Sequence, residues 1–312
     1  MRKRKHNVLR PGWTGTQTNF HLGQYVVEEK GWKKIILIGQ DYSFPWGQAQ
    51  GFIRGFCSAG GKKVNKIYHP PNTEDYSSYL LKIRSMAKEY DALAFNTAGS
   101  DMVAVFKQYF DYGLDKVIPA FGFTNAFDNT ALPALGEKSI GMFSAMHYTE
   151  GIEYAEKGMF TQEQTDRWLK FKNAYRKAYN KVPSCGAEQG YVAVMLYKKA
   201  LAAIGGDYKN TKALIDALHK TEMRDAPRGG FVFDEFGHAT QNIYIREVQK
   251  RDGDLVNVPV KAYRNITQFI DYDNMKKEYM RQPAASNSYP PGDCNELCEN
   301  GLGPYPDGKC PK

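Results

Sequence analysis

Side chains that could carry out covalent chemistry are scattered along this sequence rather than gathered into a recognisable constellation. Ser43 follows an apolar run, but it lacks the flanking glycines of a nucleophile elbow, and no histidine is placed to serve it. The glycines at 51, 55, 60 and 61 do not have the spacing of a phosphate-binding loop, and the six histidines show no metal-pair spacing. We therefore predict that the protein is not an enzyme and has no catalytic residue, metal site or cofactor.

The stretch Lys33–Trp46 instead indicates binding without bond formation. Ile35–Ile38 is an unbroken apolar run, typical of a strand covered on both faces. A short turn follows, before a helical pattern that begins at position 47, and it carries Asp41, Tyr42, Phe44 and Trp46. Ligands meet parallel sheets at the carboxyl ends of the strands, where aromatic side chains can grip a flat or apolar molecule. The sequence therefore predicts a ligand contact directly after this strand.

The composition excludes several classes of function. The chain has 312 residues, 42% hydrophobic and 24% charged, which is ordinary for a globular protein. Its net charge of +8 is spread along the sequence rather than gathered into a stripe, so we expect no nucleic-acid binding. No apolar run approaches the roughly 20 residues that a membrane helix needs. The basic start of the sequence is not followed by an apolar segment, so we expect no signal peptide within this chain.

The five cysteines do not have zinc-site spacing. Cys57 and Cys185 lie in helical or pre-helical contexts, whereas Cys294, Cys298 and Cys310 cluster near the end of the sequence. We predict either free thiols in this tail or one disulfide formed in an exporting compartment, and the pairing stays open.

The first half of the sequence alternates helical and strand patterns with short connections. Helices are predicted over 16–29, 47–58, 76–87 and 102–113, and strands over 33–38, 64–68, 91–96, 117–121 and 141–147. Repeated strand–helix–strand units of this length indicate an α/β fold with a doubly wound, mostly parallel sheet.

The second half of the sequence has a different order of predicted elements, with helices first and strands after them. A capping box at Thr161 opens a helix that ends near Tyr179, and the segment Glu188–Ile204 is apolar on most faces, which predicts central packing. A shorter helix over 210–219 is followed by three antiparallel strands over 231–233, 242–249 and 255–263. The last part, Pro283–Lys312, has no periodicity and is predicted to be irregular or disordered.

This order of elements resembles the leucine-binding-protein family, the type I periplasmic solute receptors that serve ABC importers. The matching residues extend over about Val8–Val248 and include Gly23-Gln24-Tyr25, Lys33–Gly39, Asp41-Tyr42-Ser43-Phe44, Gly51-Phe52, Gly60-Gly61, Asp75-Tyr76-Ser77-Ser78, Asp91-Ala92, Gly113-Leu114, Gly190-Tyr191, Ala200 and Phe233-Asp234-Glu235-Phe236-Gly237. The resemblance implies a two-lobed α/β receptor whose chain crosses a hinge three times and closes on a ligand.

The resemblance also implies a division of the chain. Residues 1–15 would be a connector, residues 16–147 with 242–263 would form the second, ligand-binding lobe, and 148–241 would belong to the first lobe. Residues 264–312 would form an irregular tail. Members of the family carry a further strand–helix stretch before Asn7, so we expect that the first lobe is incomplete here, through truncation rather than completion by another chain.

The resemblance and the strand-end rule together predict the residues that line the cleft. They are Phe44, Trp46, Ala98, Gly99, Ser100, Phe123, Thr124 and Asn125. Phe44 matches the position where an aromatic ring packs on the ligand, with hinge-side core packing as the alternative. Trp46 either faces the ligand or begins to pack the next helix, because Pro45 redirects the chain. Tyr42 is expected to be structural.

The nature of the solute follows from the same positions. Amino-acid receptors of the family place an acidic residue near Gly122–Asn125 to pair with the ligand ammonium, whereas Thr124 and Asn125 are uncharged. We therefore expect a ligand without an obligatory α-ammonium, with amides, carboxylic acids and aromatic acids fitting better than amino acids. His147 and Tyr148 end another strand, and a structural role is expected for His147.

The resemblance implies a solute-binding component of an ABC importer. It would lie in the periplasm or another extracytoplasmic compartment, capture a small organic solute by hinge closure, and deliver it to ABC permease subunits in the membrane. When full length it would be monomeric. The alternative is a ligand-sensing domain of the same fold coupled to a regulator or receptor.

Overall fold

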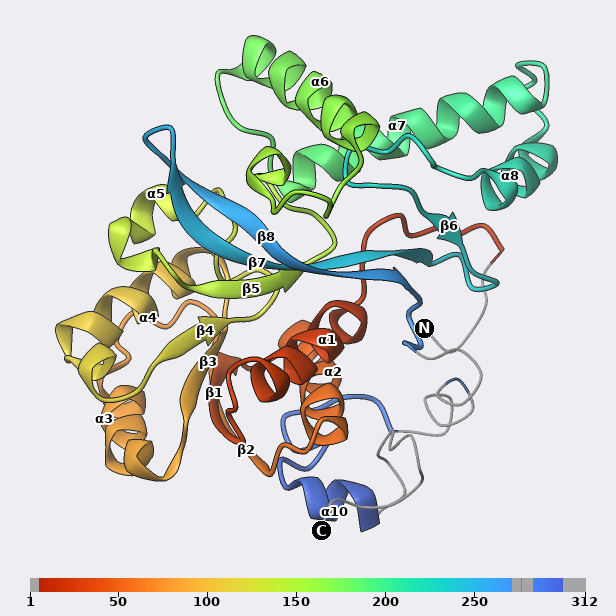
Figure 1. The fold of residues 1–312 in the computed structure, drawn as a ribbon. Coiled ribbons are helices and arrows are strands. Elements are labelled where there is room, and N and C mark those ends of the chain that lie inside the picture. Colours follow the sequence, from red (N-terminus) through yellow and green to blue (C-terminus); the bar gives the residue numbers. More distant parts are fainter. Residues whose placement is uncertain (1–5, 271–275, 277–282, 300–312) are drawn as a thin grey trace.

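A parallel sheet forms the centre of the larger part of the molecule (Figure 1). The computed structural model describes residues 6–270, 276 and 283–299. The sheet has the order β2-β1-β3-β4, and all of its neighbours are parallel. Its strands are β1 (Lys34–Gln40), β2 (Lys63–His69), β3 (Ala92–Asn96) and β4 (Ala120–Gly122). These strands and their order confirm the predicted α/β sheet.

Helices cover both faces of this sheet, because alternate residues of its strands point to opposite sides. Ile35 and Leu37 pack with α1 (Gly15–Glu28) and α2 (Ser43–Ser58), whereas Ile36 and Ile38 pack with α3 (Ser77–Met86) and α4 (Gly99–Asp111). The predicted helices are present, but α2 begins four residues earlier than expected. Phe44 and Trp46 therefore lie in its first turn rather than in a turn before it.

A second, antiparallel sheet adjoins the first. It consists of β5 (Phe143–Met146), β6 (Val232–Phe233), β7 (Ala239–Arg251) and β8 (Asp254–Ile266). The hairpin between β7 and β8 is confirmed, and Asp252 and Gly253 supply the positive φ angles of its turn. The prediction that β5 continues the parallel run is wrong, because its hydrogen-bonding partner is β7, which runs in the opposite direction.

Three helices lie beyond this sheet (Figure 1). They are α6 (Gln162–Tyr179), α7 (Cys185–Ala203) and α8 (Thr211–Lys220), and the predicted cap at Thr161 accepts a hydrogen bond from the backbone nitrogen of Gln164. The prediction that α7 is packed centrally is wrong. Only one stripe of it is buried, and Val194 on the opposite side is 69% exposed, since no described element covers that face.

Short helical segments complete the chain, and no described helix has the length and apolar character required to cross a membrane. These segments are α5 (Leu132–Leu135), α10 (Cys294–Glu299) and the 3₁₀ turns η1 (Ala87–Glu89), η2 (Leu114–Lys116), η3 (Glu137–Ser139) and η4 (Ile152–Tyr154).

The predicted irregular tail is wrong where β8 and α10 extend into it, whereas residues 283–292 contain no helix or strand, as predicted. Strand β8 continues to Ile266, past the predicted boundary at 263, and residues 283–299 are held against the parallel sheet with α10 at their end. A disulfide joins Cys57 in α2 to Cys294, and Cys298 is disulfide-bonded as well. The prediction of free tail thiols or one disulfide is therefore wrong. Residues 271–275, 277–282 and 300–312 of the predicted tail lie outside the described residues.

Glycines allow α1 and α2 to cross at close range. A Cβ atom at Gly55 would overlap the carbonyl oxygen of Phe20, and one at Gly23 would overlap the backbone of Phe52 and Phe56. These two helices pack over the buried side chains of Val26 and Phe52, so their spacing determines the packing of this face of the sheet.

We therefore expect Gly55→Ala to lower the free energy of unfolding by about 1–3 kcal/mol, because the backbones must separate to admit the methyl group. Gly190→Ala is the matched control, since a Cβ there has no neighbour within 4 Å, and the helix gains rather than loses stability. Urea denaturation of both variants measures the difference. Equal stabilities would contradict the close-packing explanation.

Candidate functional site

The predicted cleft residues follow three adjacent strands of the parallel sheet. Phe44 and Trp46 follow β1, Ala98–Ser100 follow β3, and Phe123–Asn125 follow β4. Because these strands are neighbours and parallel, their carboxyl ends lie at one edge of the sheet. The side-chain amide of Asn96, at the end of β3, donates to the carbonyl of Pro45 at 2.8 Å and so ties two of the segments together.

The aromatic side chains after β1 are partly exposed. Phe44 and Trp46 are both half-buried, and the indole nitrogen of Trp46 donates to Asp41 Oδ1 at 2.9 Å. This hydrogen bond fixes the direction of the indole ring in the first turn of α2. Tyr42, at the N-cap position, is 39% exposed. Phe44 and Trp46 therefore remain able to contact a solute at this edge.

The segment after β4 is more deeply buried. Phe123 is 1% exposed and packs on Phe52 with ring centroids 4.8 Å apart. The hydroxyl of Thr124 hydrogen-bonds with the hydroxyl of Thr18 at 2.7 Å and accepts from the amide of Asn19 at 2.8 Å. Asn125 is half-buried, and its side-chain oxygen has no hydrogen-bond partner among the described residues. In this segment, the side-chain oxygen of Asn125 can therefore accept a further hydrogen bond, whereas the hydroxyl of Thr124 already has two partners.

The segment after β3 begins α4 with exposed residues. Gly99, which has a φ of +62°, and Ser100 are exposed, and Ala98 is the N-cap residue. The next residue, Asp101, was missed by the sequence analysis. It is 3% exposed, and its Oδ2 accepts from the side chain of Gln40 at 2.8 Å and from the backbone nitrogen of Asn72 at 2.9 Å. This carboxylate therefore joins the ends of β1 and β2 to the start of α4.

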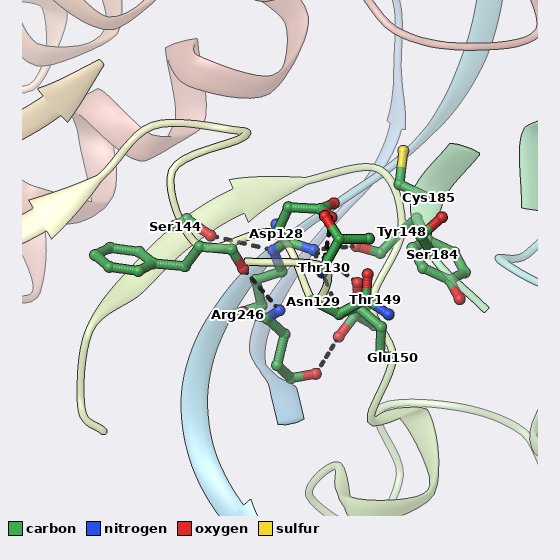
Figure 2. Close-up of polar contacts among 12 residues, drawn as sticks. Asp128, Asn129, Thr130, Ser144, Tyr148, Thr149, Glu150, Ser184, Cys185 and Arg246 are labelled. Carbon is green, nitrogen blue, oxygen red and sulfur yellow. Dashed lines mark hydrogen bonds and ion pairs between the residues drawn. The ribbon is translucent and has the colours of Figure 1, made fainter. Parts of the chain in front are cut away.

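A second set of polar residues surrounds the guanidinium of Arg246 in β7 (Figure 2). Arg246 is fully buried. It donates to Ser144 Oγ and to the carbonyl of Thr124, both at 3.1 Å. It also lies 3.4 Å from the carbonyl of Tyr148 and from the carboxylate of Glu150. One charged side chain thus connects the ends of β4 and β5 to the segment that leaves β5.

Burial determines the protonation of Glu150. Desolvation raises the pKa of its carboxyl to about 7, and this effect exceeds the opposing attraction of Arg246. The neighbouring Tyr148 hydroxyl donates to the carbonyl of Pro183 at 2.5 Å, and the side-chain amide of Asn129 lies 3.4 Å from the same oxygen. The network therefore reaches the connection between α6 and α7.

Three segments of the chain lie side by side between the parallel sheet and helices α6–α8. Arg10 forms a parallel bridge with His238, and the side chain of Gln241 donates to the carbonyl of Gly12 at 2.7 Å. The ring of His147, from the segment after β5, stacks on Trp13 with centroids 4.8 Å apart. We call these three adjacent segments the hinge region, after the hinge that the resemblance predicts.

His147 is enclosed within this hinge region. It is fully buried, both ring nitrogens lack a hydrogen-bond partner among the described residues, and burial together with the charges of Arg228 and Arg246 lowers its pKa well below the usual value. The nearby buried pair of Arg228 with Glu188, at 2.9 Å, joins α7 to the loop before β6. The structural role expected for His147 remains an interpretation, and the geometry agrees with a neutral, packed ring.

The raised pKa of Glu150 has a consequence for stability. An acid whose pKa is higher in the folded than in the unfolded chain binds its proton more readily when folded, so its contribution to stability is lost as the pH rises from about 4.5 to about 7. We expect Glu150→Gln to remove this loss. The free energy of unfolding of the variant, relative to the wild type, should rise by roughly 3 kcal/mol across this interval.

Chemical denaturation at several pH values measures this difference. Glu163→Gln is a suitable control, because it makes the same change of side chain at an α6 position that is 80% exposed. A constant difference between Glu150→Gln and the wild type would contradict the assignment.

Comparison with known proteins agrees with this architecture. A family model described as periplasmic binding protein matches residues 2–254. The Leu/Ile/Val-binding protein homolog 6 of Brucella melitensis is 31% identical over 259 residues, which are 82% of this chain and 63% of that protein. The chain therefore spans less than two thirds of the length of this curated relative.

Solved structures show the same fold. The ABC transporter substrate-binding protein from Sphaerobacter thermophilus matches with a TM-score of 0.75 and 25% identity, over 84% of this chain and 68% of that one. A solute-binding protein of an ABC transporter from Rhodopseudomonas palustris BisB5, solved with 3,4-dihydroxybenzoic acid, matches with a TM-score of 0.72 and 25% identity, over 83% and 68%. The leucine-binding protein LivK of Thermotoga maritima matches with a TM-score of 0.68 and 19% identity. The match covers 84% of this chain and 69% of the LivK chain.

Proposed function

Because the chain belongs to the periplasmic binding protein family and has the type I fold of its two-lobed members, we propose that it binds a small organic solute for an ABC importer. The observation that carries this proposal is the edge of the parallel sheet, where partly exposed Phe44 and Trp46 lie beside the segments after β3 and β4. Solute capture requires reversible closure and no bond making. ABC permease subunits would be the membrane partners.

The hinge supports this mode of action. The three segments that lie side by side join the parallel sheet to helices α6–α8, and their contacts are chiefly hydrogen bonds and ring stacking. A rotation about such segments changes a few backbone angles while the packed parts move as units. Closure would bring residues from both sides of the hinge onto a solute held at the strand ends.

The predicted cleft residues favour an aromatic or carboxylic acid over an amino acid. Thr124 and Asn125 are uncharged, and the hydroxyl of Thr124 is already engaged by Thr18 and Asn19. None of the predicted cleft residues is a carboxylate that could pair with an ammonium group. The similarity to a solute-binding protein solved with 3,4-dihydroxybenzoic acid points to the same class of solute.

An extracytoplasmic location agrees with the disulfide between Cys57 and Cys294. Stable structural disulfides form in oxidising compartments and are rare in the cytosol. The family implies the same location, in which an importer's binding component meets its solute before the membrane.

Isothermal titration of the complete gene product tests the proposal. We expect binding of 3,4-dihydroxybenzoate or benzoate in preference to leucine, and we expect Phe44→Ala to weaken it roughly tenfold or more, because a partly buried aromatic contact is lost. Tyr208→Ala, at a 63% exposed position between α7 and α8, is the matched control and should leave the affinity unchanged. Absence of binding to acids, amides and amino acids alike would count against solute capture.

A further inference from the structure

The C-terminal strap, defined as residues 283–299, is a feature that the family does not explain, because the family match ends at residue 254. The strap lies along β2, the outermost strand of the parallel sheet (Figure 1). The backbone nitrogen of Val64 donates to the carbonyl of Gly292 at 2.7 Å, and the nitrogen of Cys294 donates to the carbonyl of Lys62 at 3.1 Å. Lys63 and Asp293 thus form an antiparallel bridge, as a fifth strand would.

The strap covers an edge that would otherwise offer unpaired backbone groups. β2 pairs with β1 on one side only, and an open edge strand is a template for another extended chain. The fit is close, because a Cβ atom at Gly292 would overlap the carbonyl oxygen of Val64. The ammonium of Lys66 adds hydrogen bonds to the carbonyls of Ser288 and Pro290, at 2.9 and 2.7 Å.

Charge and burial make the contact specific. The strap carries three acidic residues and no lysine or arginine, whereas the edge that it covers presents Lys62, Lys63 and Lys66. Leu297 is fully buried and belongs to the same apolar cluster as Val64 and Cys57. The strap therefore combines strand pairing, an apolar anchor and opposite charge.

A disulfide bond links the strap to α2. The disulfide between Cys57 and Cys294 links positions 237 residues apart, so it keeps the strap at high local concentration beside β2. A dithiol reductant breaks the sulfur–sulfur bond, supplies two electrons and two protons to form two thiols, and becomes a cyclic disulfide itself. After this exchange the non-covalent contacts alone hold the strap.

We infer that the strap is a releasable cap, locked by the Cys57–Cys294 disulfide, over a basic sheet edge that accepts an extended acidic peptide. Reduction frees the strap and exposes the edge of β2. The partner that fits is a strand with acidic side chains and a glycine opposite Val64, because the strap itself has these properties. The inference does not depend on the identity of the solute.

Hydrogen exchange on the full chain tests the lock. The Val64 amide should exchange at least tenfold faster after dithiothreitol treatment, and also in the Cys57→Ser/Cys294→Ser variant, than in the oxidised wild type. Cys185→Ser is the matched control, because Cys185 is a buried thiol outside any disulfide. Unchanged protection of Val64 after complete reduction would overturn the inference.

A peptide-binding measurement tests the edge itself. The probe is a peptide of residues 286–297 with serine in place of Cys294, and the receptor is reduced Gly292→Ala protein, whose own strap cannot dock closely. We expect binding to this receptor and at least tenfold weaker binding to the oxidised wild type. A peptide with Asp293→Lys and Glu296→Lys should also bind at least tenfold more weakly. Failure of the reduced variant to bind the probe, or equal binding of the two peptides, would overturn the inference.

Discussion

The buried guanidinium of Arg246 is the constraint on which the relative positions of β4, β5 and β7 depend. A charge removed from water is tolerated only where hydrogen bonds and an opposite charge replace its hydration. Its partners come from the segment after β4, from β5 and from Glu150. These elements must end at fixed positions relative to β7, and the residues after β4 that are predicted to line the cleft are placed by the same contacts.

The parallel sheet could be predicted because the sequence patterns that indicate its strands and helices are each contained within a short segment. The apolar run Ile35–Ile38 and the 3.6-residue periodicity of α3 each identify an element without reference to the rest of the chain. The direction of β5 and the exposure of α7 could not be predicted in this way. Periodicity identifies the apolar face of a segment, whereas the strand that pairs with it, or the element that covers it, is determined by distant parts of the chain.

The same reasoning explains which residues could be placed at the sheet edge from the sequence. The segments after β1, β3 and β4 were predicted from their place at strand ends, and the structure brings them to one edge of the sheet. Arg246 and Glu150 were missed because their contact joins positions 96 residues apart. A signal was present, since Arg246 interrupts the apolar residues Ile243, Tyr244, Ile245 and Val248 of β7, but a charge within a strand does not reveal its partner.

The hydrogen bonds to Arg246 fall into two groups by length. The contacts to Ser144 and to the carbonyl of Thr124 are both 3.1 Å, within the usual range for nitrogen–oxygen bonds. Those to Tyr148 and Glu150, in the segment that leaves β5 toward α6, are 3.4 Å and weaker. In the proposed closure, rotation of helices α6–α8 would act on the longer contacts, while the shorter ones would keep Arg246 attached to β5 and to the segment after β4. The proposed open and closed states could then share the same buried charge, because its shorter contacts are to β5 and to the segment after β4.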